Sequence, residues 1–260
     1  MPGRYRGLYY PDDEVYDSPY SRGMAFDEVF FESGDGTRLS GWFVYAKDVA
    51  DPRQAKGTVI HMHGNAQNMT AHWQLAEWLP LRGYHLFTFD YRGFGQSGGV
   101  PEPKGVFEDA VAALDYVRSR PDIDTEKLFV FGQSMGGMLA IAAASASPEG
   151  VRAVFAESPV YSYSLSFRDR IPEHRPQVDD AYCAAGRVAQ LAPVPLLLLH
   201  GTSDNVVSYS HSVALMEEAK APKRLVTIDG GGHIDAMTKR YGTRYQDLVV
   251  TFFEEAISAS

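Results

Sequence analysis

Short runs of apolar residues recur along the chain, and from residue 57 onward they alternate with segments whose apolar positions repeat at a helical period. Fully apolar runs such as residues 196–199 are typical of strands in a parallel sheet, because helices cover both faces of such a sheet. Before residue 57, two runs separated by a glycine-containing turn predict a hairpin. The predicted strands are residues 27–33, 38–45, 58–63, 84–90, 128–131, 151–157, 194–200 and 224–229.

Helices are predicted between these strands. In residues 105–118 the apolar side chains fall on one face at helical spacing, while Glu108, Asp109 and Asp115 fall on the other. We interpret these carboxylates as a solvated face and not as a catalytic pair. The other helices are predicted near residues 71–82, after residue 134, near 211–219 and near 244–258. The alternation predicts an α/β fold in three layers, a mostly parallel eight-stranded sheet flanked by helices on both faces.

Two stretches fall outside this alternation. Residues 1–24 are rich in Tyr, Pro and Asp and predict an extended arm laid on a single domain that spans residues 25–260. Residues 158–193 lie between two sheet strands and mix aromatic with charged residues. Connections longer than about fifteen residues are usually functional or disordered, which favours a small cap over the catalytic edge; the alternative is a long connecting loop with a helix. Substrate contacts are predicted from three aromatic residues of this insertion: Tyr161, Tyr163 and Phe167.

The composition narrows the class of protein. A net charge of −9 argues against a general nucleic-acid role, because an acidic surface repels phosphates. The single cysteine, Cys183, cannot form an intrachain disulfide, no Cys/His cluster has metal-ligand spacing, and no cofactor is predicted. The N-terminus does not match a signal peptide, and no apolar run approaches twenty residues. A cytoplasmic protein is expected, or a membrane-associated or exported one if residues precede Met1. The oligomeric state is not predicted.

The pattern Gly-x-Ser-x-Gly occurs twice, at residues 95–99 and 132–136. The second match lies between a β-branched and aromatic run and a long run of small apolar residues, which predicts a strand turning directly into a helix. This is the setting of a nucleophile elbow, where a serine is held out above the edge of a sheet. Ser97 is followed by two glycines and two prolines, which cannot start a stable helix. We therefore predict Ser134 as the nucleophile and Ser97 as a loop residue.

A serine hydroxyl is a weak nucleophile and needs an imidazole to take its proton. In this type of fold the order along the chain is serine, acid, histidine. Among the histidines after Ser134, His233 lies in a glycine-rich loop just past a predicted strand, where such sheets place their chemistry. His211 stands at a predicted helix start, where a solvated side chain is the usual interpretation. We predict His233 as the base.

The predicted acid is Asp204, which follows the apolar strand ending at His200. The ordinary role of an aspartate in such a loop is to cap a turn. Asp229 is an alternative, but it lies one strand later and only four residues before His233. Asp235 would have to fold back on the loop that carries His233.

Acyl transfer also needs hydrogen-bond donors for the oxyanion. One donor is expected from the residue after the nucleophile, the backbone N–H of Met135, and the other from the loop after an earlier strand. Residues 63–66 follow the predicted strand 58–62 at that place in the order, so the backbone N–H of Asn65 is the second predicted donor. His63 is interpreted as a brace for this loop.

These motifs together resemble the α/β-hydrolase superfamily from about residue 27 onward. The resemblance rests on the elbow, on His63-Gly64-Asn65-Ala66, on the segment 90–97, on Gly201-Thr202-Ser203-Asp204 and on Gly230-Gly231-Gly232-His233. They look most similar to small serine hydrolases that include esterases, monoacylglycerol-lipase-like proteins and acyl-protein thioesterases. In that family the segment 90–97 supports the active site. Many members carry an N-terminal membrane anchor, and none is visible in this sequence.

The resemblance and the predicted triad imply a carboxylic-ester hydrolase that acts on small-molecule esters with short or medium acyl chains through an acyl-enzyme intermediate. An acyl-thioesterase or a monoacylglycerol lipase is the alternative, because the triad specifies acyl transfer without naming the acyl group. Further alternatives are a peptidase and a binding protein without turnover, although a pure binding protein has no need for Ser134, Asp204 and His233 together.

Overall fold

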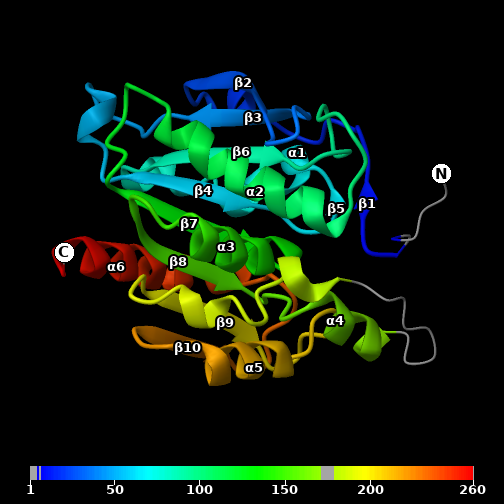
Figure 1. The fold of residues 1–260 in the computed structure, drawn as a ribbon. Helices are drawn as coiled ribbons and strands as arrows, with labels where there is room; N and C mark the ends of the chain where they lie inside the picture. Colours follow the sequence, from blue (N-terminus) through cyan, green and yellow to red (C-terminus); the bar gives the residue numbers. More distant parts are fainter. Residues whose placement is uncertain (1–4, 6, 171–178, 260) are drawn as a thin grey trace.

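The computed structural model describes residue 5, residues 7–170 and residues 179–259. Its centre is an eight-stranded sheet with the strand order β10-β9-β8-β7-β4-β6-β3-β2 (Figure 1). Strand β3 is antiparallel to both of its neighbours, and all other pairs are parallel. The predicted mostly parallel eight-stranded sheet is thus confirmed. The strands are β2 (Phe26–Glu32), β3 (Arg38–Val44), β4 (Thr58–Met62), β6 (His85–Asp90), β7 (Leu128–Gln133), β8 (Val151–Glu157), β9 (Leu196–Gly201) and β10 (Lys223–Ile228).

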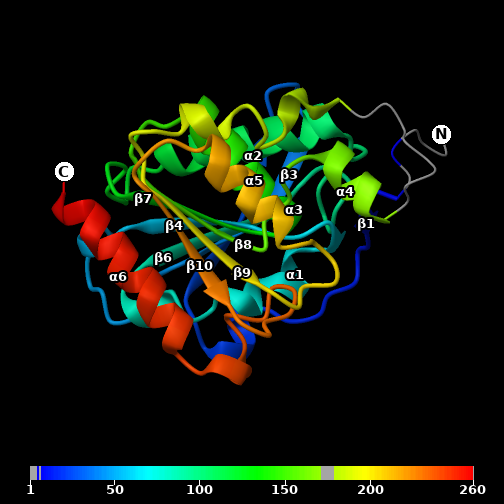
Figure 2. The same ribbon diagram turned by 90° about the horizontal axis from the view of Figure 1, so that it is seen from below.

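Helices cover both faces of this sheet, as predicted (Figure 2). Helices α2 (Pro103–Arg118), α3 (Met135–Ala146) and α5 (Ser210–Glu218) lie on one face. Helices α1 (Met69–His72) and α6 (Arg244–Ser258) lie on the other. Helix α4 (Tyr163–Arg170) follows β8, at the right of Figure 1.

Two hydrophobic cores separate the layers, and alternate residues of each strand enter alternate cores. Val130 of β7 packs in the core under α2 and α3, whereas Phe129 and Phe131 pack in the core under α6. In β9, Leu196 and Leu198 face the first core and Leu197 and Leu199 the second. The alternation follows from the two-residue period of a strand, and it explains why these strands are apolar without interruption.

One helix prediction is wrong. Residues 71–82 do not form one helix: α1 ends at His72, and two 3-10 turns follow at Trp73–Leu75 and Pro80–Arg82. Proline at position 80 lacks the amide hydrogen that a continuing helix needs, and it restricts the residue before it.

The interpretation of Asp109 as a solvated residue is also wrong. Its carboxylate is fully buried and accepts hydrogen bonds from the backbone N–H of Arg92 at 2.8 Å and from the guanidinium Nη2 at 2.8 Å. The same guanidinium reaches Asp35 at 2.9 Å. A helix position that reads as exposed therefore faces a buried arginine from the loop after β6.

The N-terminal arm runs along the carboxyl-end side of the sheet. Strand β1 (Tyr10–Pro11) pairs in parallel with β5 (Ala66–Gln67), which immediately follows the loop after β4. Leu8 and Tyr9 are buried. The arm is therefore packed against the end of the sheet at which chemistry is expected.

Candidate active site

Ser134 stands at the junction of β7 and α3 with φ 57° and ψ −120°. This left-handed region is rarely adopted by residues other than glycine, so the turn is strained at the serine. The neighbouring glycines permit close packing: a Cβ at Gly136 would collide with the backbone oxygens of Met62 and His63, and one at Gly132 with that of Gly136. The turn therefore packs backbone against backbone, as a nucleophile elbow requires.

Asp204 and His233 meet at the same edge of the sheet. Asp204 follows β9 and His233 follows β10, and His233 Nδ1 donates to Asp204 Oδ2 at 2.8 Å. The other carboxylate oxygen accepts the backbone N–H groups of Val206 and Val207, each at 2.9 Å. With Nδ1 bound to the carboxylate, Nε2 is the ring nitrogen left to exchange a proton.

A second histidine also reaches this carboxylate. His200 Nε2 donates to the Val207 carbonyl at 2.9 Å and lies 3.3 Å from Asp204 Oδ2, while its Nδ1 accepts a hydrogen bond from Ser212 Oγ at 2.7 Å. Burial alone would raise the pKa of Asp204, but the hydrogen bonds from His200 and His233 hold it well below its ordinary value. The acid is thus ionised and fixed. Sequence reasoning missed His200, whose only signal is its position at the end of β9.

The elbow serine is not hydrogen-bonded to this pair. Within the described parts of the chain, Ser134 Oγ has no hydrogen-bond partner, and the side chain is 6% exposed. In enzymes without substrate, catalytic hydrogen bonds are often long and tighten only when substrate binds. Ser134 follows the carboxyl end of β7, and Asp204 and His233 follow those of β9 and β10. All three therefore lie at the same edge of the sheet, where β8 separates β7 from β9.

The loop after β4 lies beside Ser134. A Cβ built on Gly64 would be 3.9 Å from the Ser134 Cβ. Among the described residues, the backbone N–H of Asn65 has no hydrogen-bond acceptor, and the Met135 N–H, at the first position of α3, has none within its helix. Two free backbone donors next to a serine match what an oxyanion site needs.

The imidazoles near this loop act as braces. His63 Nδ1 donates to the Gly64 carbonyl at 2.8 Å, and its Nε2 lies 3.2 Å from Asp90 Oδ1. His72 Nε2 donates to the Ala66 carbonyl at 3.1 Å, and burial lowers the pKa of His72 to about 4. Both rings are thereby bonded to backbone carbonyls of this loop, which suits support of the loop.

A chain of buried polar groups that the sequence did not reveal lies beneath the elbow. His61 Nε2 donates to Gln133 Oε1 at 3.1 Å, and Gln133 Nε2 donates to Glu157 Oε2 at 2.7 Å. Glu157 Oε1 accepts the backbone N–H of Ala236, in the loop that carries His233, at 2.8 Å. Burial raises the pKa of Glu157 to about 7, against the lowering effect of these hydrogen bonds. The elbow and the histidine loop are therefore joined through one carboxyl group.

The alternative catalytic residues have other partners. His211 is buried and its Nδ1 accepts the backbone N–H of Tyr161 at 2.9 Å. Asp229 accepts from Thr202 Oγ1 at 3.3 Å, and Asp235 forms an ion pair with Arg240. Each of these side chains is used to hold a loop or helix in place.

In its described residues, the insertion between β8 and β9 holds α4 and two 3-10 turns, Asp180–Tyr182 and Val188–Gln190. The hydroxyl of Tyr161 donates to Glu218 of α5, and the buried Tyr163 shares a hydrogen bond with Tyr9. The Phe167 side chain lies outside the described part of the chain. The prediction that these residues contact substrate stays a prediction.

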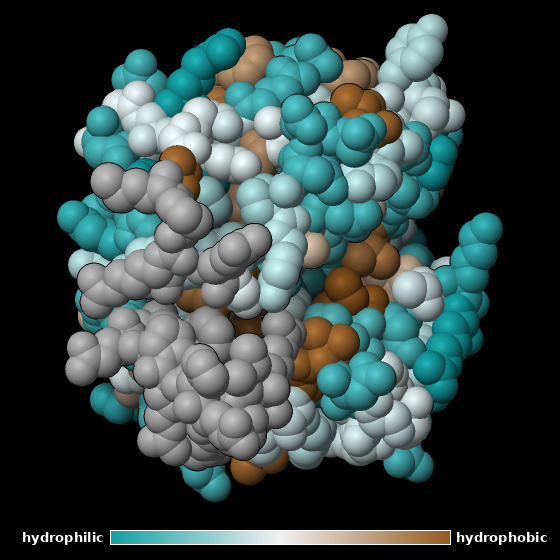
Figure 3. Space-filling view, turned by 90° about the vertical axis from the view of Figure 1, so that its right-hand side faces the viewer, coloured by the Kyte–Doolittle hydropathy of each residue, from teal (hydrophilic) through white to brown (hydrophobic). Residues whose placement is uncertain are grey.

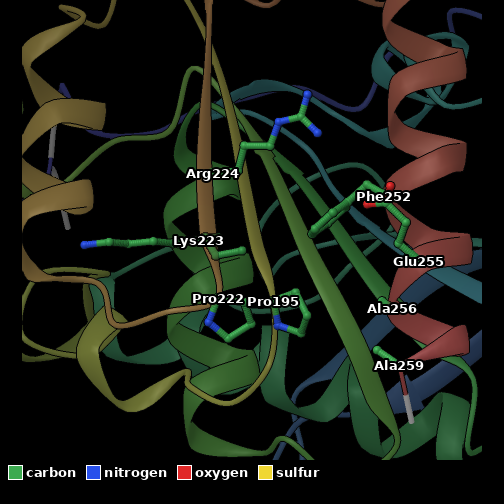
Figure 4. A pocket seen from close by; sticks show the side chains of 9 residues that line it. Pro195, Pro222, Lys223, Arg224, Phe252, Glu255, Ala256 and Ala259 are labelled. Carbon is green, nitrogen blue, oxygen red and sulfur yellow. The ribbon is translucent and has the colours of Figure 1, made fainter.

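Apolar residues gather near the middle of the carboxyl-end face of the molecule (Figure 3). A separate pocket of about 290 Å³ lies at the opposite end, at the start of β9 and β10 beside the end of α6 (Figure 4). It is lined by Pro195, Leu196, Pro222, Lys223, Arg224, Phe252, Glu255, Ala256 and Ala259. Because Ser134, Asp204 and His233 follow the carboxyl ends of their strands, this pocket is remote from them. Among the described helices, none is both long and apolar enough to cross a membrane.

Comparison with known proteins places these features in context. The family model "Serine aminopeptidase, S33" matches residues 53–181. "Uncharacterized protein YfhR" from Salmonella typhimurium is 41% identical over 97% of this chain and 88% of its own length. "Alpha/beta hydrolase domain-containing protein 17B" from Xenopus tropicalis is 30% identical over 86% of this chain and 74% of its own length. The structure of the Pyrococcus furiosus esterase Pf2001 superposes with a TM-score of 0.76 at 20% identity, covering 96% of this chain and 97% of that one.

Proposed function

Because this chain belongs to the α/β-hydrolase family, we propose that it is a serine hydrolase that cleaves carboxylic esters with short or medium acyl chains. The observation that carries the proposal is the hydrogen bond between His233 Nδ1 and the buried Asp204, at the same sheet edge as the strained elbow serine. An ionised acid that orients an imidazole beside a serine is the arrangement used for acyl transfer.

In the proposed mechanism, His233 Nε2 accepts the proton of Ser134 Oγ as that oxygen attacks the ester carbonyl carbon. Asp204 holds the imidazole by its Nδ1–H and stabilises the imidazolium. The backbone N–H groups of Asn65 and Met135 donate to the oxyanion of the tetrahedral intermediate. His233 then gives its proton to the departing alcohol, which leaves an acyl-enzyme on Ser134, and water attacks this ester by the same steps in the second half of the reaction.

The ester substrate is supported by the Pyrococcus furiosus structural neighbour, which is an esterase, and by the apolar patch on the carboxyl-end face. A thioester or a monoacylglycerol presents the same acyl carbonyl to the serine, so these remain alternative substrates of the same machinery. The matching family model is described as a serine aminopeptidase, so a peptide is a further alternative substrate.

A fluorophosphonate probe tests the reaction class, because it phosphonylates activated serines. We expect labelling of the native wild-type protein and of Ser97→Ala, and no labelling of Ser134→Ala or of heat-denatured protein. An unlabelled native wild-type protein would contradict the proposal.

The substrate class is tested by a panel of p-nitrophenyl esters from acetate to palmitate, together with acyl-thioesters, a monoacylglycerol and aminoacyl-p-nitroanilides. We expect the highest kcat/KM on esters with short or medium acyl chains. A higher kcat/KM on the thioesters, on the monoacylglycerol or on the anilides would replace the ester assignment.

A further inference from the structure

The N-terminal arm is hydrogen-bonded to the residue that we assign as an oxyanion donor. The backbone N–H of Tyr10 donates to the Asn65 carbonyl at 2.8 Å, and the Asn65 side-chain Nδ2 donates to the Leu8 carbonyl at 2.6 Å. Two residues further along each segment, the Asp12 N–H donates to the Gln67 carbonyl at 3.2 Å. Asn65 is therefore held through both its carbonyl and its side chain by residues far away in the sequence.

These bonds fix the direction of the Asn65 N–H. That N–H shares a peptide plane with the Gly64 carbonyl, which His63 Nδ1 holds at 2.8 Å. The following peptide plane is held by Tyr10, and the side chain between them by Leu8. A donor that must point at an oxyanion gains from such preorganisation, because it need not reorient during the reaction.

The arm is itself firmly attached. Asn68 Nδ2 donates to the Asp12 carboxylate at 2.7 Å and to the Glu14 carbonyl at 2.8 Å, and the Gly95 N–H donates to the Asp12 carbonyl at 2.9 Å. Leu8 and Tyr9 are only 7% and 8% exposed. The segment is thus anchored by two buried residues and by hydrogen bonds from the loops beside it.

The arm also contacts the insertion between β8 and β9. The hydroxyl oxygens of Tyr9 and Tyr163 are 2.8 Å apart, and the two rings pack edge to face with centroids 6.2 Å apart. Tyr163 is the first residue of α4. One short segment therefore touches both the loop that stabilises the oxyanion and the insertion beside the site.

We propose that residues 8–12 are a working part of the active site: they position the Asn65 backbone N–H for oxyanion stabilisation, and the Asn65 side chain acts as a positioning group through Leu8. The inference rests on the proposed function and deepens it. It assigns a role in transition-state stabilisation to a segment that lies outside the family-model match at residues 53–181.

Two substitutions each remove one of the bonds that hold Asn65, without removing the arm. Asn65→Ala deletes the bond to the Leu8 carbonyl and keeps the Asn65 backbone N–H. Tyr10→Pro deletes the donor to the Asn65 carbonyl, at a residue that is 55% exposed. It also removes the Tyr10 hydroxyl, which donates to the Gly7 carbonyl within the arm at 3.1 Å. Tyr16→Phe is the control, because it removes an arm hydroxyl that donates to the Asp12 carboxylate and is not one of the groups that hold Asn65.

For Asn65→Ala and Tyr10→Pro we expect kcat on p-nitrophenyl butyrate to fall about tenfold or more, with KM within about twofold, as for lost transition-state interactions. Binding of a trifluoromethyl ketone, which forms the tetrahedral oxyanion on the serine, should weaken by a similar factor. Tyr16→Phe should change neither quantity.

The outcomes separate the two proposals. If both variants keep wild-type kcat and wild-type affinity for the ketone, the positioning role is overturned, even if their melting temperatures fall. If the wild-type protein neither reacts with a fluorophosphonate nor hydrolyses any ester, the proposed function fails, and the positioning role fails with it.

Discussion

Two loops of this protein carry the same Gly-Gln-Ser-x-Gly sequence, one around Ser97 and one around Ser134, and the fold uses them in opposite ways. Ser97 Oγ donates to the Asp90 carbonyl at 2.7 Å and accepts the backbone N–H of Ser40 at 2.9 Å. Ser134 Oγ has no hydrogen-bond partner among the described residues, and its backbone is strained. The first hydroxyl links strands β3 and β6, whereas the second is available for the proposed reaction.

The glutamines of the two loops also differ in burial and in hydrogen bonding. Gln133 is fully buried, and both ends of its amide are hydrogen-bonded, to His61 and to Glu157. Gln96 is exposed. The same residue types therefore acquire different roles because one loop is embedded between strands and a helix and the other lies on the surface.

The largest expected effect separates the two serines directly. Ser134→Ala should lower kcat by about 10⁴-fold or more, because no nucleophile remains. Burst and steady-state assays with p-nitrophenyl butyrate measure this, with circular dichroism to show that the fold persists. Turnover near the wild-type level in Ser134→Ala would remove the distinction between the loops.

The next largest loss of kcat is expected at Asp204, the proposed acid of the site around Ser134. In Asp204→Asn the amide oxygen should stay with the two backbone donors of Val206 and Val207, which leaves the NH₂ group facing His233. The imidazole is then held in the wrong tautomer, so kcat should fall by about 10³- to 10⁴-fold. Asp229→Asn, at the alternative acid, should keep wild-type kcat; a loss there and not in Asp204→Asn would reverse the assignment.

The buried carboxyl group of Glu157, which accepts a hydrogen bond from Gln133, should make the stability of the protein depend on pH. The pKa of Glu157 is raised to about 7 from 4.5, so the native state holds a proton that the unfolded chain releases. Its stabilising contribution is complete below about pH 4.5 and is lost as the pH rises toward 7, a change of up to about 3 kcal/mol. We expect the difference in unfolding free energy between wild-type protein and Glu157→Gln to follow this slope in urea titrations from pH 5 to 8. A pH-independent difference would contradict this interpretation.

The smallest effect belongs to the other serine. Ser97→Ala leaves the Asp90 carbonyl and the Ser40 N–H without their partner, which should lower the free energy of unfolding by about 1–2 kcal/mol. Urea denaturation measures this loss. The value of kcat should stay within about twofold, and a large loss of kcat at unchanged stability would mean that Ser97 takes part in the chemistry.

Features encoded locally were predictable from the sequence. The strands and the three layers follow from apolar runs separated by helical periods, which are properties of neighbouring residues. The meeting of Asp204 and His233 follows from parallel strands placing their carboxyl ends at one edge.

Features that depend on distant segments could not be predicted. Asp109 reads as a surface residue until Arg92 is placed against it. The strand pairing of residues 10–11 with 66–67 joins segments with no shared pattern, and Pro11 even argues against a strand. The link from Gln133 through Glu157 to the histidine loop requires knowing which strand ends are neighbours.

The backbone conformation of Ser134 has a consequence for the protein as a whole. A non-glycine residue with φ 57° and ψ −120° costs on the order of 1 kcal/mol or more, and glycine would adopt the same turn with little strain. With the proposed function, the most stable form of this chain is therefore not the active one, since the substitution that relaxes the turn also removes the proposed nucleophile. Selection for stability and selection for activity act in opposite directions at this single position.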